Sequence, residues 1–236
     1  KGRAMKVRRL HEWTQEYREA VAIQDRLAAR VEQGPPLESA ETIAAADVSG
    51  GRRGEWIAAA AVVLVDGATL EPLETRRAGM TATWPYVPGC LSFREIPALL
   101  EAFKRLERRP DVVLCDGQGR AHPRRLGLAS HLGLALEVPT VGCAKSRLVG
   151  EVRGEVGHER GSRAALMDEG ERIGTVLRTR TGVRPLYVSV GHRIDLASAE
   201  RWVLATATRF RLPEPARAAH RVVTAYKKAH AECGQA

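Results

Sequence analysis

Three β-prone runs in direct succession, followed by strict alternation of helical and β-prone runs, constrain the fold of this 236-residue chain more than any other feature. The β-prone runs are short and apolar, and the helical runs repeat apolar residues every three or four positions. Strands are expected at 42–48, 56–65, 70–78, 111–115 and 139–144, and helices at 93–109 and 126–136. Helical crossovers imply parallel strand pairs beside the antiparallel hairpins, so the sequence predicts a mixed central sheet flanked by helices.

Further elements flank this pattern on both sides. An amphipathic helix is expected over residues 7–33, while the polar, glycine-rich residues 150–170 are expected to form a loop. Residues 173–178 and 186–190 predict a strand pair, Asp195 is expected to cap a helix through about 207, and a last helix should end near 232. This order is that of an α/β, ribonuclease H-like fold. We expect a single catalytic domain over 1–236, with residues 1–5 set aside as an expression remnant.

The charge balance favours a polyanionic partner. Lys and Arg outnumber Asp and Glu by 37 to 28, a formal charge of +9, which attracts nucleic acid, although arginine-rich chains are also basic without binding it. No run approaches the roughly 18 to 20 apolar residues of a membrane span, and no secretory leader is recognisable. The four cysteines lie far apart without zinc-ligand spacing, which fits a reducing compartment. The expectation is a cytoplasmic monomer that acts on nucleic acid without a membrane.

Three carboxylates stand where strand ends and a helix start would place them. Asp47 and Asp116 each end an apolar, strand-like run, where an acid is costly unless it is paired or bound to a metal. Asp47 equally suits a strand-end turn, and Glu95 equally suits a capping box begun by Ser92. Three such carboxylates are typical of enzymes that position metal ions for phosphodiester cleavage. The expected cation is Mg²⁺, with Mn²⁺ as a substitute.

Three segments carry a family resemblance. Residues 84–95 read WPYVPGCLSFRE, in which an aromatic ring lies between two prolines just before the helix of Glu95. Residues 116–125 read DGQGRAHPRR, and residues 142–148 read GCAKSRL. In this order, and over about residues 40 to 215, these motifs resemble those of the endonuclease V family.

The resemblance implies a metal-dependent endonuclease of DNA repair. Such an enzyme recognises deoxyinosine or inosine and cuts the second phosphodiester bond on its 3′ side, leaving a 3′-hydroxyl and a 5′-phosphate. Asp47 and Asp116 would be the metal ligands, and Glu95 would complete the acidic site. Lys145 would stabilise negative charge on the phosphate, although a solvated strand-end lysine is the alternative. His220 would have a secondary, phosphate-side role.

The resemblance also implies how the damaged base is recognised. Tyr86, between Pro85 and Pro88, would fill the space left by the extruded base. The substrate-binding set would further comprise Gly89, Leu91, Gly117, Gly119, His122 and Gly127. Many family members have histidine at the position of Gln118 and lysine at that of Ser146, so no role for those side chains carries over.

Two alternative functions remain open at this stage. The first is a ribonuclease that acts mainly on inosine-containing RNA, where recognition involves the 2′-hydroxyl and single-stranded bases. The second is a non-catalytic nucleic-acid-binding module. The complete acidic set argues against the second, because a binder gains little from burying carboxylates near phosphate.

Overall fold

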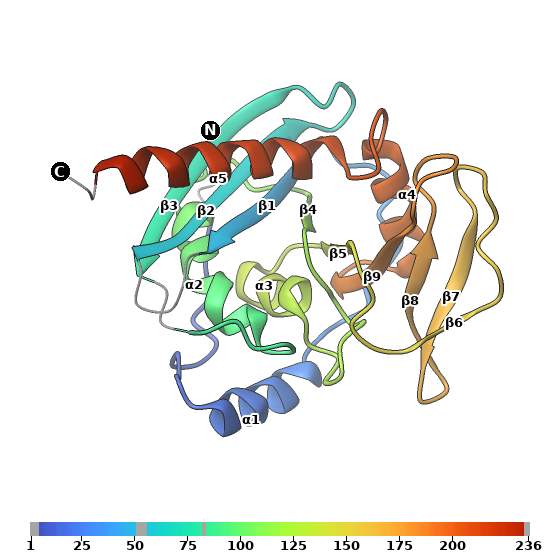
Figure 1. Cartoon of the computed structure of the whole chain (residues 1–236), viewed down its shortest axis with the longest axis horizontal. Coiled ribbons are helices and arrows are strands. Elements are labelled where there is room, and N and C mark those ends of the chain that lie inside the picture. Colours follow the sequence, from blue (N-terminus) through green and yellow to red (C-terminus); the bar gives the residue numbers. More distant parts are fainter. Residues whose placement is uncertain (1–4, 51–55, 82–83, 234–236) are drawn as a thin grey trace.

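The computed structural model describes residues 5–50, 56–81 and 84–233, and its centre is a nine-stranded sheet (Figure 1). The strands are β1 (Thr42–Gly50), β2 (Trp56–Asp66), β3 (Pro72–Thr81), β4 (Val112–Cys115), β5 (Thr140–Ala144), β6 (Glu151–Arg153), β7 (Arg163–Asp168), β8 (Glu171–Leu177) and β9 (Leu186–His192). Their order across the sheet is β3-β2-β1-β4-β5-β9-β8-β7-β6. The pairs β1·β4 and β4·β5 are parallel, and the other neighbouring pairs are antiparallel. The predicted mixed sheet is confirmed.

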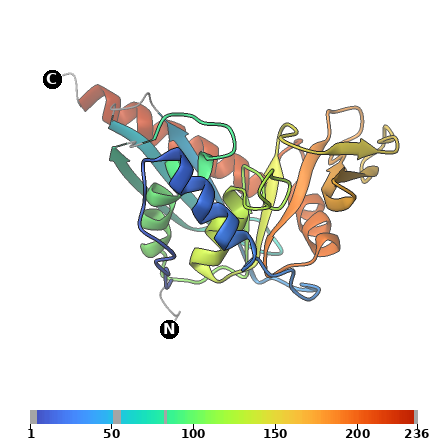
Figure 2. The ribbon, with the colours of Figure 1, turned by 90° about the horizontal axis from the view of Figure 1, so that it is seen from below.

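Helices cover both faces of this sheet. They are α1 (Tyr17–Ala28), α2 (Leu91–Lys104), α3 (Leu128–Leu136), α4 (Leu196–Thr206) and α5 (Glu214–Cys233). One apolar core lies between the sheet and α2 and α3, and a second lies between the sheet and α4 and α5. Helix α1 lies outside α2 and α3 as a further layer (Figure 2). Among the described residues, no helix combines the length and apolar character that crossing a membrane would require.

The alternation of side chains along the central strands determines where the aspartates point. On β1, Ala44 and Ala46 join the core under α2 and α3, whereas Ile43 and Ala45 join the core under α5. Asp47, the next residue in this alternation, therefore faces α5. Strand β4 runs parallel to β1, with Ala46 opposite Cys115, so Asp47 and the residue after Cys115 reach the same edge.

The N-terminal segment differs from its prediction. The helix expected over 7–33 is wrong outside 17–28, because residues 5–16 run without regular structure along α3 and the backbone N–H of Arg8 donates to the Ala135 carbonyl at 2.8 Å. The apolar side chains of Met5, Val7 and Leu10 pack on the core, which satisfies their burial without a helix. Met5 is buried and packs on the core, whereas residues 1–4 lie outside the described residues.

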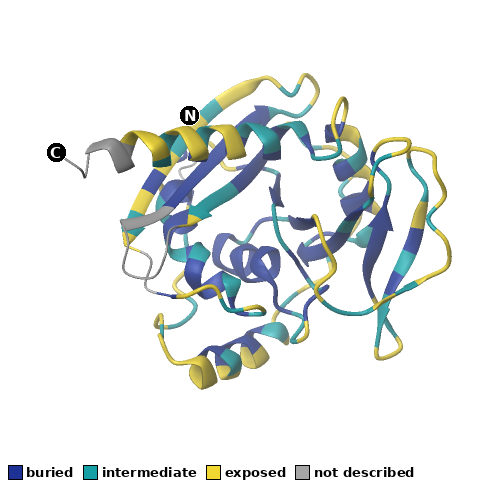
Figure 3. Ribbon diagram, in the orientation of Figure 1, coloured by how far each residue is buried: buried dark blue, intermediate teal, exposed yellow. Residues whose placement is uncertain are grey.

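The polar stretch 150–170 is also corrected, because it forms strands rather than a loop. Strands β6 and β7 extend the sheet to its last edge (Figure 3), where half of each strand is solvated. Ala164 and Leu166 of β7 are buried, while the intervening residues are polar or partly exposed, and glycines with positive φ at 150, 154 and 161 make the turns. Polar edge strands are common because they resist further strand pairing. The predicted hairpin turn at 49–54 lies partly outside the described residues, but β1 and β2 pair as a hairpin requires.

The burial pattern predicts how two leucines differ in their contribution to stability. Leu132 of α3 is fully buried between helix and sheet, whereas Leu73 of β3 is 44% exposed. Leu132→Ala should lower the free energy of unfolding by about 2–5 kcal/mol, and Leu73→Ala by less than about 0.5 kcal/mol. Urea denaturation measures both. Equal losses in the two variants would contradict the assigned core.

Candidate active site

Asp47 lies inside β1, which continues beyond it to Gly50 instead of ending there as the sequence predicted, and it has one partner from the backbone and one from α5. Its Oδ1 accepts from the backbone N–H of Val48 at 2.9 Å, and its Oδ2 accepts from Nδ1 of His220 at 2.7 Å. The Asp47 side chain is 12% exposed while that of His220 is 63% exposed, so the pair links the interior of the site to its surface. Burial raises the pKa of Asp47, and the hydrogen bond from His220 opposes that rise.

Asp116 follows β4 and forms an ion pair with Lys145, which follows the neighbouring strand β5. Because β4 and β5 are parallel, their carboxyl ends meet at one edge and bring these residues together. A guanidinium NH2 group of Arg211 donates to the Lys145 carbonyl at 2.7 Å and to the Pro185 carbonyl at 2.8 Å, which holds the lysine backbone in place. The Lys145 side chain remains 46% exposed, so its ammonium group can still meet an anion from solution.

Glu95 is the third carboxylate, and the structure excludes its alternative role in a capping box. Helix α2 begins at Leu91, so Ser92 lies inside the first turn, and the N-cap residue Cys90 makes no side-chain capping bond. Burial, followed by the nearby charges of Asp47 and Asp116, raises the pKa of Glu95 to about 8. A carboxylate with this pKa is largely protonated at neutral pH unless positive charge enters the site.

The donor set suits a hard cation held by few protein ligands. The three carboxylates repel one another, as the effects of Asp47 and Asp116 on the Glu95 pKa show, and a divalent cation would relieve that repulsion. Among the described residues, no three His, Cys, Asp or Glu side chains form a ready metal cage. Asp47 and Asp116 would therefore supply one or two ligands and leave the rest to water and phosphate oxygens, as Mg²⁺ usually requires.

The loop before α2 exposes one aromatic ring and buries another. Tyr86 is 71% exposed, whereas Trp84 is 3% exposed and donates its indole N–H to the Thr14 carbonyl. The Tyr86 ring therefore does not pack inward as part of the core of the loop. Arg94 of α2 donates to the Trp84 carbonyl at 2.5 Å, so the base of the loop is fixed while its tip is free to contact a ligand.

The carbonyl of Gly89 is the anchor of this loop, since it accepts hydrogen bonds from three side chains. Gln24 Nε2 donates to it at 2.9 Å, His122 Nε2 at 3.0 Å and an NH2 group of Arg124 at 2.9 Å. Burial lowers the pKa of His122 to about 4, so its ring is neutral at pH 7 and acts as a fixed donor. Gly89 has φ +78°, a left-handed conformation that favours glycine at this turn.

A cavity of about 50 Å³ lies behind this anchor. Its lining residues are Gly89, Leu91, Ser92, Gln118, His122, Gly127, Leu128 and Leu148. Four of the residues predicted to bind the base are thus brought together, whereas Gly117 and Gly119 are not among the lining residues. A Cβ on Gly119 would lie 2.1 Å from the Val190 carbonyl oxygen, so packing against backbone requires glycine there, whereas one on Gly117 would lie 3.1 Å from the Leu128 side chain, a tight contact.

Sequence reasoning missed the residues that support the site. Gln24 is 1% exposed, and its Oε1 also accepts from Nε of Arg124 at 2.7 Å. The signal was a glutamine on the buried stripe of α1, which otherwise consists of Ala20, Ile23 and Leu27. Nothing in the sequence pointed to the contact of Arg211 with Lys145, because these residues lie 66 positions apart.

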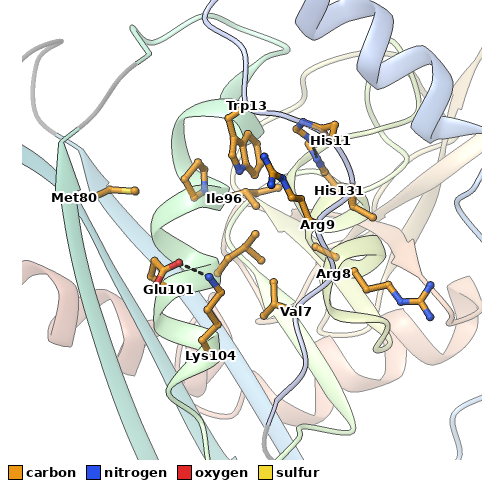
Figure 4. Close-up of a pocket in the computed structure, with 14 residues that line it drawn as sticks. Val7, Arg8, Arg9, His11, Trp13, Met80, Ile96, Glu101, Lys104 and His131 are labelled. Carbon is orange, nitrogen blue, oxygen red and sulfur yellow. Dashed lines mark hydrogen bonds and ion pairs between the residues drawn. The ribbon is translucent and has the colours of Figure 1, made fainter.

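A second hollow, of about 360 Å³, lies between the N-terminal segment and α2 (Figure 4). Trp13, His11 and His131 line one end of it, and the ion pair of Glu101 with Lys104 lies at the other. Its described lining includes none of the three predicted active-site carboxylates. This hollow is therefore separate from the three carboxylates.

The chain is similar over most of its length to known proteins. The family model described as Endonuclease V matches residues 25–221. Endonuclease V of Rhodospirillum centenum is 52% identical over 89% of this chain and 88% of that protein. The crystal structure of Endonuclease V from Streptomyces avermitilis is 41% identical, covers 95% of this chain and 99% of that chain, and has a TM-score of 0.85. These similarities confirm the predicted ribonuclease H-like fold class.

A more distant structure contains nucleic acid. Ciona intestinalis Endonuclease V was solved in complex with a 23mer DNA containing an inosine followed by a ribo-adenosine. It is 24% identical, covers 90% of this chain and 97% of that chain, and has a TM-score of 0.78, so its likeness concerns the fold.

The anchor at Gly89 predicts that Gln24 stabilises the protein beyond its apolar contacts. Gln24→Leu removes one donor to the Gly89 carbonyl and the acceptor of Arg124, and should lower the free energy of unfolding by about 1–3 kcal/mol. Gln15→Leu, at an exposed position just before α1, is the matched control and should change stability little. Urea denaturation compares the two; indistinguishable curves would remove Gln24 from the anchor.

Proposed function

The chain belongs to the Endonuclease V family, whose members are metal-dependent nucleases, and from that premise we propose that it repairs DNA by cutting next to deaminated bases. The proposed reaction breaks the second phosphodiester bond 3′ to deoxyinosine and leaves a 3′-hydroxyl and a 5′-phosphate. We propose Mg²⁺ as the cation, with Mn²⁺ as a substitute, and a monomer in the cytoplasm as the acting form. DNA is the proposed substrate, and matched DNA and RNA oligonucleotides compared at one salt concentration test that choice.

One observation carries the proposal: two of the three carboxylates share a segment with residues that line the cavity. Helix α2 carries Glu95 and follows the Tyr86 loop, while the segment after β4 carries Asp116 and then Gln118 of the cavity wall. A base held in the cavity would therefore keep its own strand beside the carboxylates. That arrangement supports a nuclease that cuts at a fixed distance from the base it binds.

Each side chain of the site has a part in the proposed reaction. Bound Mg²⁺ would activate water and screen the charge of the phosphate. The Lys145 ammonium group, already beside Asp116, supports negative charge that develops on the phosphate oxygens. Glu95, with a pKa of about 8 in the absence of a cation, releases its proton when positive charge enters the site.

Recognition is assigned to the exposed loop. Trp84 and Gly89 hold the ends of the loop in place, and Tyr86 projects from the loop into solvent. Its ring can therefore enter the stack of nucleobases at the place that the damaged nucleobase has left. Unstacking costs least at a mismatched or damaged pair, which contributes to selectivity before any direct contact with the base.

The acidic set predicts that Asp116→Asn abolishes cleavage of a deoxyinosine duplex in Mg²⁺, by at least about a hundred-fold, because the amide cannot supply the charge that holds a cation. The fold should survive, since the substitution changes volume little. Asp25→Asn, at an exposed position on α1, is the control and should cut normally. Single-turnover cleavage measures both. Near-normal cleavage by Asp116→Asn would refute the metal assignment.

The exposed loop predicts that Tyr86→Ala weakens binding to a deoxyinosine duplex by about ten-fold or more, because stacking on an aromatic side chain contributes roughly 1–3 kcal/mol per base. Tyr86→Phe keeps the ring and should retain most of the affinity. Fluorescence anisotropy gives the affinity, and thermal melts show whether the fold is intact. A large drop in melting temperature with unchanged affinity per folded molecule would refute the role of Tyr86 in binding.

A further inference from the structure

The turn between β7 and β8 carries two carboxylates that oppose each other. Asp168 ends β7, Glu171 begins β8, and the two residues are paired across the strands. Glu169 and Gly170 between them have φ values of +50° and +82°, as the tight turns of hairpins require. Like charges directly opposite each other on paired strands are destabilising. The β7–β8 hairpin therefore needs a positive charge from elsewhere in the fold.

Two arginines of residues 120–125, which follow β4 and Asp116, supply that charge. Arg125 Nη1 lies 2.8 Å from Asp168 Oδ2, and Arg125 Nε donates to Glu171 Oε2 at 2.8 Å. Arg120 forms an ion pair with the other carboxylate oxygen of Glu171. The side chains of Arg125 and Asp168 are only 16% and 20% exposed, so salt screens this pair less than it screens a pair on the open surface.

Apolar contacts join the same two parts of the chain. Ala121 is buried in one cluster with Leu166 of β7 and with Ile173 and Val176 of β8. These contacts hold residues 120–125 against the hairpin, whereas the hydrogen bonds of the arginines with the carboxylates fix their orientation, because such bonds are directional. Removing the two carboxylate charges should therefore loosen the orientation of residues 120–125 without detaching them from the sheet.

The backbone of Arg125 depends on these contacts. Its φ is +54°, in the left-handed region that residues other than glycine rarely adopt. Its backbone N–H and its Nη1 both donate to the His122 carbonyl, at 2.9 Å and 3.0 Å. A residue keeps such a conformation only when the surrounding contacts fix it. Arg125 thus connects the carboxylates of the hairpin to the backbone of His122.

Residues 120–125 also hold the loop that carries Tyr86. The Gly89 carbonyl, three residues after Tyr86, accepts from Nε2 of His122 at 3.0 Å and from an NH2 group of Arg124 at 2.9 Å. Because the Tyr86 ring is 71% exposed, its position depends on the backbone of the loop rather than on packing of the ring. A continuous series of contacts therefore runs from the hairpin to the loop.

We propose that Asp168 and Glu171 are positioning residues for nucleic-acid binding, because they fix residues 120–125, which in turn fix the loop of Tyr86. This proposal rests on the proposed function. It gives the β7–β8 hairpin, which carries none of the predicted site residues, a part in binding the substrate. The three carboxylates of the active site are held by other elements, so loss of the hairpin charges should weaken binding and leave cleavage of bound DNA nearly unchanged.

The test uses a hairpin variant that combines Asp168→Asn with Glu171→Gln, which removes both charges with little change of volume. Its affinity for a deoxyinosine duplex, measured by fluorescence anisotropy without metal, should fall about five-fold or more, because a loosened loop must be ordered on binding. Single-turnover cleavage by saturating protein in Mg²⁺ should stay within about two-fold of wild type. The variant is more positive by two charges, so a general electrostatic effect would tighten its binding to DNA instead.

Glu169→Gln is the matched control. Glu169 lies in the same turn, but its side chain is 88% exposed and approaches Arg125 only to 3.8 Å, so its loss should leave affinity unchanged. Thermal melts of all variants give the folded fraction at the assay temperature. If the hairpin variant is unfolded there, Asp168→Asn and Glu171→Gln are measured singly, since each removes only part of the contact with Arg125.

A double-mutant cycle shows whether the effect passes through Tyr86. In the background of Tyr86→Ala, the hairpin substitutions should weaken binding by less than about two-fold, because the ring that they position is gone. A purely structural role of the hairpin would instead weaken binding equally in both backgrounds. Equal losses of affinity in the two backgrounds would therefore overturn the proposal.

The outcomes distinguish this proposal from the function on which it rests. Wild-type protein that fails to cut deoxyinosine DNA would refute the proposed function. Wild-type protein that cuts it, together with a folded hairpin variant that binds the duplex as tightly as wild type or more tightly, would overturn only the positioning role of Asp168 and Glu171.

Discussion

The parallel pairing of β1 with β4 is the constraint on which the site depends. Ala46 lies opposite Cys115 in this pairing, so the residues that follow them, Asp47 and Asp116, are brought to one edge of the sheet. The ionised forms of two neighbouring carboxylates repel each other unless a positive charge lies beside them. Lys145 after β5 supplies that charge to Asp116, and His220 on α5 forms a hydrogen bond with Asp47, so residues distant in sequence meet at the two acids.

Glu95, the third carboxylate, is also affected by the negative charges of the two aspartates. Burial and then the charges of the two aspartates raise the pKa of Glu95 to about 8, and the charge of Arg94 opposes that rise only in part. The hydrogen bond from Arg211 to the Lys145 carbonyl supports the ion pair of Lys145 with Asp116, because it fixes the strand end from which the lysine extends.

The sequence predicted the parts of this structure that depend on local pattern. Alternating apolar residues located the central strands, and the positions of Asp47 and Asp116 at strand ends were sufficient to expect their convergence. The pattern failed where long-range contacts decided the conformation. Residues 5–16 carry helical spacing yet lie along α3, and Gln24 gains its role from Gly89 and Arg124, 65 and 100 positions away. Pairings of this kind leave no periodic trace in a single sequence.

The tight packing of the loop after β4 has a consequence for how this chain can change. Gly119 lies against the Val190 carbonyl, and a Cβ there would approach its oxygen to 2.1 Å, so position 119 cannot acquire a side chain without moving backbone. Gln118 is buried, and its Nε2 donates to the Ser146 carbonyl at 2.9 Å. A library randomised over this loop would therefore lose folded members wherever position 119 carries a side chain.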